Sequence, residues 1–100
     1  MPSKSKIKGN NFERECVNKA KIKGIKSERA YASDGRALGL SSEVDILIGD
    51  WAIQCKIRKK IASFLQIPDG ADAVVFRENN GKSMVLIDYN DFLDYLVLIY

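Results

Sequence analysis

Residues 44–56 have the sequence VDILIGDWAIQCK and predict a β-hairpin. Two β-rich runs, Val44 to Ile48 and Trp51 to Arg58, flank Gly49-Asp50, a pair of residues that suits a two-residue type II′ turn. This turn fixes the register, because Ile48 must then lie opposite Trp51. The same register places Asp45 opposite Gln54.

The two faces of this hairpin differ sharply in polarity, because successive side chains of a strand point to opposite sides. One face is apolar and carries Val44, Ile46, Ile48, Trp51, Ile53, Cys55 and Ile57. The other carries Glu43, Asp45, Gln54 and Lys56. We expect the apolar face to pack on the core, with Trp51 buried, and Phe64 and Phe76 to be core residues as well.

Upstream of the hairpin, apolar residues recur at helical spacing from Phe12 to Ala20. They predict a helix that is capped by Asn10 or Asn11 and runs to about Lys23. Residues 25–33 predict a first strand, and residues 33–42, with two glycines and three serines, predict a loop.

Downstream, residues 59–66 predict a short helix that ends at the turn residues 68–70. Residues 73–77 and 83–87 predict a second hairpin around Asn80-Gly81, and Asp88 is placed to cap a terminal helix. The element order is therefore αβββαββα. It indicates one α/β domain over residues 1–100, with helices flanking a mixed, restriction-endonuclease-like β-sheet.

Composition narrows the possible functions. The chain has 100 residues and no histidine, which excludes histidine general bases, Ser-His-Asp triads and histidine-ligated metal sites. Any catalysis must use carboxylates, lysine, tyrosine or cysteine. The longest apolar run is six residues, far below the roughly 20 that span a bilayer, so we expect no membrane segment.

Charge is distributed unevenly along the chain. Residues 1–36 contain 10 Lys and Arg against 4 Asp and Glu, a net +6, whereas residues 37–100 contain 6 against 9, a net −3. We interpret residues 1–8 as a basic arm and the first third of the chain as facing a polyanion. Solvated surface lysines remain the simple alternative.

The two cysteines, Cys16 and Cys55, are too few for a disulfide framework. Two buried thiols in a reducing cytoplasm are the expected arrangement, although the sequence leaves a single bridge open. The small size also fits a phage-encoded protein in the cytoplasm of its host.

The polar face of the hairpin could carry chemistry. Opposed residues on one face have Cβ atoms about 4.5–5.5 Å apart, so the carboxylate of Asp45 and the amide oxygen of Gln54 could share one hard cation. Lys56 is a diagonal neighbour, and Glu13 reaches the core margin from the first helix. This layout suits Mg²⁺-assisted phosphodiester hydrolysis, but a solvated hairpin face with a surface ion pair is equally compatible with it.

Three segments together resemble the PD-(D/E)xK nuclease superfamily, and most closely its archaeal-type Holliday junction resolvases. They are residues 8–15, with the sequence KGNNFERE, residues 44–49 and residues 53–56. The resemblance implies that Glu13, Asp45 and Gln54 are Mg²⁺ ligands, with Mn²⁺ as a substitute metal, and that Lys56 is the catalytic lysine. Loop 33–42 would be mobile near the junction backbone. DNA contacts would fall to Lys8, Arg14, Arg36, Arg58, Lys59 and Lys60.

Two positions depart from the family pattern. Val44 replaces the proline, and Gln54 occupies the second acidic position, as in some restriction and homing endonucleases of the superfamily. Glu43, on the same face, could supply the missing charge. The expected protein is a homodimeric resolvase of four-way DNA junctions, because a two-fold junction requires two symmetric cuts. A nicking, restriction-type or homing endonuclease and a non-catalytic DNA-binding protein with the nuclease fold are the alternatives.

Overall fold

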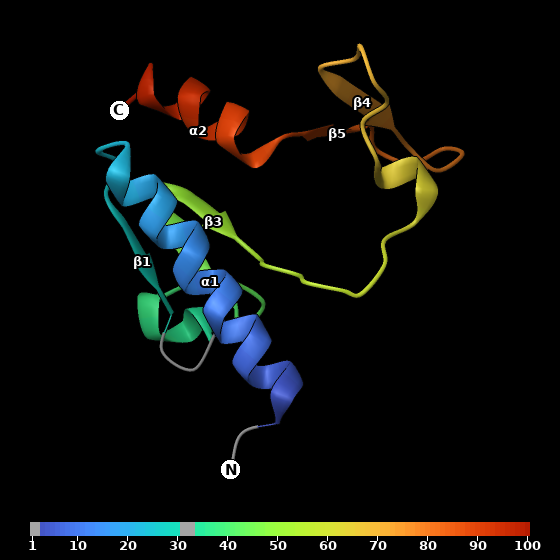
Figure 1. Cartoon of the computed structure of the whole chain (residues 1–100). Coiled ribbons are helices and arrows are strands. Elements are labelled where there is room, and N and C mark those ends of the chain that lie inside the picture. The colour runs from blue at the N-terminus through green and yellow to red at the C-terminus, as the bar shows by residue number, and fades with distance from the viewer. Residues whose placement is uncertain (1–2, 31–33) are drawn as a thin grey trace.

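The computed structural model describes residues 3–30 and 34–100. Its elements run in the order α1 (Lys4–Ile22), β1 (Ser27–Arg29), η2 (Gly35–Leu38), β2 (Ile46–Ile48), β3 (Trp51–Ile53), η3 (Ser63–Leu65), β4 (Ala73–Phe76), β5 (Met84–Ile87) and α2 (Tyr89–Val97). Figure 1 shows α1 lying across the β1–β2–β3 sheet, with β4 and β5 at the far side of the molecule. The two η elements are single 3₁₀ turns.

The predicted β2–β3 hairpin is confirmed in its register. Ile48 pairs with Trp51, Leu47 with Ala52 and Ile46 with Ile53. Gly49 adopts φ 55°, the positive value that a type II′ turn requires at its first central position. The strand β1 pairs antiparallel with the other side of β2, so β2 is the central strand of this sheet.

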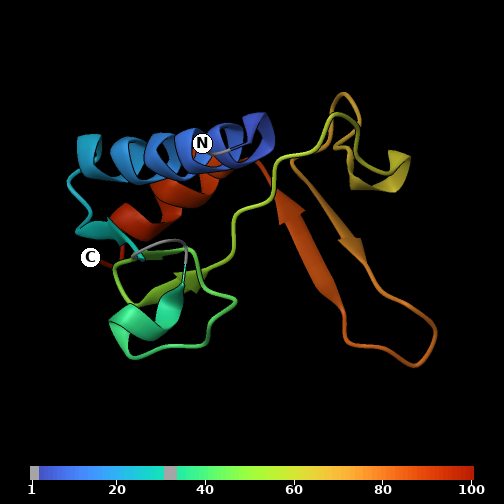
Figure 2. The same ribbon diagram turned by 90° about the horizontal axis from the view of Figure 1, so that it is seen from below.

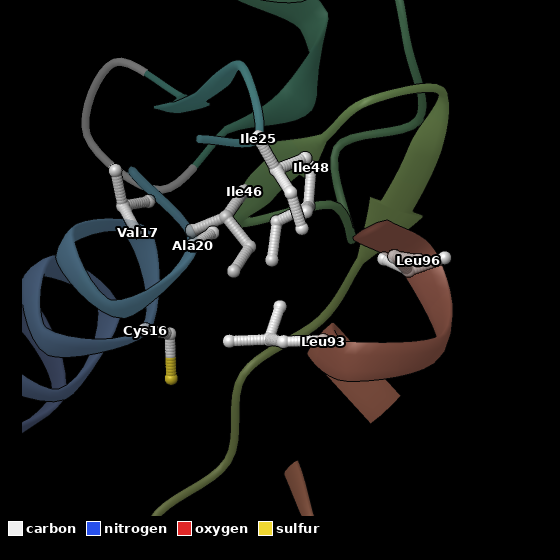
Figure 3. Packing of buried hydrophobic residues seen from close by; sticks show 8 residues of the cluster. All are labelled: Cys16, Val17, Ala20, Ile25, Ile46, Ile48, Leu93 and Leu96. Carbon is white, nitrogen blue, oxygen red and sulfur yellow. The ribbon is translucent and has the colours of Figure 1, made fainter. Parts of the chain in front are cut away.

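The core forms where both helices cover one face of this sheet. Ile46 and Ile48 of β2 are fully buried, and they meet side chains of α1, Ile25 and two leucines of α2 (Figure 3). The buried set comprises Cys16, Val17, Ala20, Ile25, Ile46, Ile48, Leu93 and Leu96. The central part of the predicted apolar face is therefore confirmed as a core face. Its outer members are less buried than expected, and Trp51 is 49% exposed with its ring edge-on to Phe92 at 5.3 Å.

The first helix begins earlier than the sequence pattern predicted. Ser3 is its N-cap, and the Ser3 hydroxyl accepts a hydrogen bond from the backbone N–H of Lys6 at 3.1 Å. The predicted cap at Asn10 or Asn11 is wrong, and residues 4–8 of the predicted basic arm form the first turns of α1. Periodicity missed these turns because their residues are exposed, and only the serine signalled the start.

The helix predicted over residues 59–66 does not form, and the chain makes only the 3₁₀ turn η3 there. No side chain caps this turn, and three basic residues in succession, Arg58 to Lys60, precede it. Phe64 is 59% exposed, and its ring lies 5.8 Å from that of Phe76. Without a buried face a helix this short gains too little to form. The prediction of Phe64 as a core residue is therefore also wrong.

The second hairpin is confirmed, but it stands apart from the first sheet. Strands β4 and β5 pair only with each other among the described residues, and every described strand pair is antiparallel. The mixed sheet predicted from the sequence is thus not shown; parallel pairing needs a crossover, and residues 54–72 supply no helix for one. Figure 2 shows the hairpin projecting beside the helix-covered sheet. The Cα radius of gyration is 14.8 Å, above the roughly 13 Å typical of 100 residues.

The terminal helix α2 is capped by Asp88 as predicted. The Asp88 carboxylate accepts hydrogen bonds from the backbone N–H groups of Asn90 and Asp91. Leu93 and Leu96 face the core, whereas Leu98 and Ile99 lie beyond the helix and are 83% and 70% exposed. Ile99 is therefore not part of the face of α2 that packs on the core.

The substitution Leu93→Ala tests the position of the core. We expect it to lower the free energy of unfolding by about 2–5 kcal/mol, because it leaves a cavity against Ile46 and Ile48. Leu98→Ala is the matched control and should cost less than about 0.5 kcal/mol, since that side chain is solvated. Urea denaturation followed by circular dichroism measures both, and equal losses would contradict this packing.

Candidate functional site

Asp45 is held in place by hydrogen bonds at three of its groups. It directly precedes β2; its backbone N–H donates to the carbonyl of Ile53 at 2.9 Å, and its carbonyl accepts from the N–H of Ala30 at 2.8 Å. Its side-chain Oδ2 accepts from the backbone N–H of Cys55 at 2.7 Å. The half-buried carboxylate therefore lies beside the peptide that connects Gln54, Cys55 and Lys56.

Gln54 faces a different partner from the one predicted. Strand pairing ends at Ile46 and Ile53, and both Asp45 and Ile46 lie against Ile53, an arrangement typical of a β-bulge. The predicted cross-strand pairs of Asp45 with Gln54 and of Glu43 with Lys56 are consequently not formed. Instead, Nε2 of Gln54 donates to Oε2 of Glu43 at 3.0 Å.

Glu13 is buried on α1, with 6% of its surface exposed. Its Oε1 accepts hydrogen bonds from Nε and Nη2 of Arg29, at 3.2 and 3.0 Å, and Nη2 also donates to Oδ1 of Asn10 at 3.2 Å. A buried carboxylate requires such a partner, because an uncompensated charge in the protein interior is costly. Sequence reasoning missed Arg29 and Asn10, although Arg29 lay in the predicted first strand and Asn10 in the KGNNFERE segment.

Lys56 is the exposed cation of the group. It makes no hydrogen bond or ion pair with any residue in the described part of the chain. It lines a cavity of about 390 Å³ between α1 and the segment that follows β3. The other residues of that wall include Gln54, Cys55, Cys16, Lys19 and Tyr89.

The two cysteines lie against each other in this cavity wall, and both are free. Hydrogen bonding from the Cys55 thiol lowers the pKa of Cys16. The same contact, burial and the nearby carboxylates of Asp45 and Glu13 all raise the pKa of Cys55.

Tyr89 connects the terminal helix to this region. Its hydroxyl donates to the carbonyl oxygen of Cys16 at 2.6 Å, and burial raises its pKa. Because the phenol stays protonated at neutral pH, this hydrogen bond fixes α2 against α1. Tyr89 therefore has a structural role at the cavity, and the sequence showed it only as a helix residue.

The available oxygen atoms suit an Mg²⁺ ion that has few protein ligands better than one coordinated entirely by protein side chains. In residues 3–30 and 34–100, no three Asp, Glu or Cys side chains gather closely enough to hold a metal. Mg²⁺ usually keeps several waters and takes only one or two carboxylates from the protein. Oδ1 of Asp45, which accepts no hydrogen bond from the described residues, and Oε1 of Gln54 fit that role, whereas Glu13 is already engaged by Arg29.

The predicted DNA-contact residues fall in separate places. Lys8 lies on the exposed side of α1 beside a cavity of about 440 Å³, and Arg14 is held by Asn11 one turn away. Arg36, on η2, pairs with Asp34, and this guanidinium lowers the pKa of the Asp34 carboxyl. The remaining three, Arg58, Lys59 and Lys60, line a surface hollow of about 470 Å³.

The predicted loop over residues 33–42 is covered only in part, because Ser33 lies outside the described residues. The rest contains η2, which is closed by Gly39 at φ 74°. No helix in the described part of the chain is long and apolar enough to cross a membrane.

Comparisons with protein-family models, with curated proteins and with solved structures found no match for this chain.

The ion pair between Glu13 and Arg29 can be tested by the substitution Arg29→Met. Losing both hydrogen bonds to a buried carboxylate should cost about 1–3 kcal/mol of unfolding free energy. Arg14→Met, on an exposed face of α1, is the control and should change stability little. Chemical denaturation measures both variants. A loss at Arg29 no larger than that at Arg14 would contradict a structural ion pair.

Proposed function

We propose that the protein is an Mg²⁺-dependent endodeoxyribonuclease that resolves four-way DNA junctions. One observation carries the proposal: the Asp45 carboxylate is fastened by a 2.7 Å hydrogen bond to the residue between Gln54 and Lys56. One carboxylate, one amide oxygen and one exposed ammonium group are thereby held on neighbouring segments. The resemblance of these segments to the PD-(D/E)xK nucleases supports the same interpretation.

In this proposal, Asp45 and Gln54 would hold the cation, which would supply Lewis-acid polarisation of the scissile phosphate. The other steps belong to residues of the chain. The ammonium group of Lys56 orients the attacking water and offsets the charge that develops on the phosphate. Cys55 keeps Asp45 in position through its backbone N–H, and Arg29 compensates the charge of Glu13 while leaving that carboxylate near the site.

DNA would approach over the basic run that follows Lys56. The run Arg58, Lys59 and Lys60 follows directly after Lys56, so phosphates that contact it would lie next to the reactive group. Lys8 and Arg14 add positive charge on α1. Such contacts release counterions, so binding by this surface should weaken steeply as salt rises.

A homodimer belongs to the same proposal. Two symmetric cuts require two copies of the site, and we assign the contact between subunits to the exposed apolar side chains around the end of α2. Its exposed members are Tyr95, Val97, Leu98, Ile99 and Tyr100.

A second candidate function, DNA binding without cleavage, is favoured by one specific observation. Gln54 is neutral and donates to Glu43, and Glu13 is engaged by Arg29, so Asp45 is the one anionic ligand that the proposal assigns to the cation. A site with one anionic ligand binds Mg²⁺ weakly. A nicking, restriction-type or homing endonuclease would use the same residues on a different DNA substrate.

The substitutions Asp45→Asn and Lys56→Met test the proposed chemistry. Asn keeps an oxygen that can accept from Cys55, so the fold should survive while cleavage of a four-way junction falls at least about 100-fold. Lys56→Met should have a similar effect and leave junction binding within a few fold. The measurement is Mg²⁺-dependent cleavage of junction and linear duplex DNA, beside binding in Ca²⁺.

Asp72→Asn and Lys82→Met are the matched controls, since both side chains are exposed and distant in sequence from the site. Normal cleavage by the Asp45 and Lys56 variants would show that the site is misassigned. Preference for linear DNA would favour the restriction-type alternative. Tight junction binding with no cleavage by the unmodified protein would favour the non-catalytic alternative.

The substitution Gln54→Glu separates the two candidate functions. It adds an anionic oxygen near Asp45, so a nuclease should need less Mg²⁺ for half-maximal cleavage. The new carboxylate also faces Glu43, so the double variant Gln54→Glu, Glu43→Gln should show the larger gain. A Mg²⁺ titration of junction cleavage measures both effects. If both variants require as much Mg²⁺ as the unmodified protein, Gln54 is not a ligand.

A further inference from the structure

The only two cysteines of the chain come together although 39 positions separate them in the sequence. Cys16 lies on α1, three residues after Glu13, and Cys55 lies on the segment after β3, between Gln54 and Lys56. Both side chains line the same cavity of about 390 Å³. Cys16 is 5% exposed and belongs to the buried core, while Cys55 is half-buried and packs against that core.

We propose that Cys16 and Cys55 are a modification site at which a peroxide forms an intramolecular disulfide. The geometry supports it, because Cys55 packs against the core cluster that contains Cys16, and both side chains line one cavity that a molecule as small as hydrogen peroxide can reach. The bond joins α1 to the segment that carries Gln54 and Lys56. Its formation does not depend on the proposed nuclease activity.

The first step is oxidation of Cys16. Its sulfur attacks one oxygen of hydrogen peroxide, the O–O bond breaks, and hydroxide leaves and is protonated to water, so that Cys16 becomes a sulfenic acid. Cys16 is the better nucleophile of the pair, because hydrogen bonding from Cys55 and the charge of Lys19 lower its pKa.

In the second step the sulfur of Cys55 attacks the sulfur of Cys16. The S–O bond breaks, and the hydroxyl leaves as water with the proton of the Cys55 thiol. Two thiols and one peroxide thus become one disulfide and two waters.

Intact mass spectrometry of the full chain tests the proposal. Reduced protein is treated with a moderate excess of hydrogen peroxide, denatured, and alkylated with N-ethylmaleimide. We expect a monomer about 2 Da lighter than the reduced form, with both thiols lost together. Peptide mapping should find the segments around residues 16 and 55 cross-linked. These measurements involve no DNA, so their outcome does not depend on whether the protein cleaves DNA.

Stability provides a second measurement. The disulfide closes a long loop, so the Tm of the oxidised protein should rise by at least about 5 °C and return to its original value with dithiothreitol. The control variant Cys55→Ala should instead stop at a Cys16 sulfenic acid that dimedone labels, with no such rise. If this variant does not fold, the mass and the Tm of the unmodified protein before and after peroxide treatment still test the proposal.

Three outcomes would overturn the proposal. They are two thiols that persist after peroxide treatment, cross-links between different molecules, and oxygen addition without a bond between residues 16 and 55.

Discussion

The burial of Ile46 and Ile48 is the constraint on which the remaining structure depends. Both side chains lie on one face of the central strand, and both helices meet there. A shift of one residue in the pairing of β2 with β3 would turn this face toward solvent. Because the register is fixed, Asp45 always enters β2 beside Ile53, and its carboxylate reaches the backbone of Cys55. The geometry of the candidate site is thus a by-product of core packing.

Polar groups near this core are each matched by a specific partner. Glu13 is buried and meets Arg29, Asp45 accepts from Cys55, and the hydroxyl of Ser27 donates to the carbonyl of Val17. No buried side-chain nitrogen or oxygen among the described residues lacks a hydrogen bond. In a small domain such matching limits what the carboxylates can do, since a group held for stability is less available to a ligand. The proposed cation site therefore relies on Oδ1 of Asp45 and Oε1 of Gln54.

Local rules predicted the parts of the fold that local chemistry determines. The glycine of the β2–β3 turn fixed the register, and Asp88 marked the start of α2. Wrong predictions arose where tertiary contacts decide the outcome. Residues 59–66 have a helical pattern, but they have no core surface to pack against. At the β-bulge beside Asp45, the side chain of Gln54 hydrogen-bonds to Glu43 rather than facing Asp45. Arg29 was missed because its role appears only when β1 lies beside α1, and no pattern within either segment encodes that contact.

The position of Leu93 and Leu96 in the sequence has a consequence for synthesis of the chain. These residues complete the core around Ile48, but 45 positions separate Ile48 from Leu93. Between them the chain forms the isolated β4–β5 hairpin, and a two-stranded hairpin alone is marginal in water. While the ribosome makes that segment, the apolar face of β2 is covered by α1 alone. A chaperone that shields exposed isoleucines would therefore have its longest opportunity to bind during this interval.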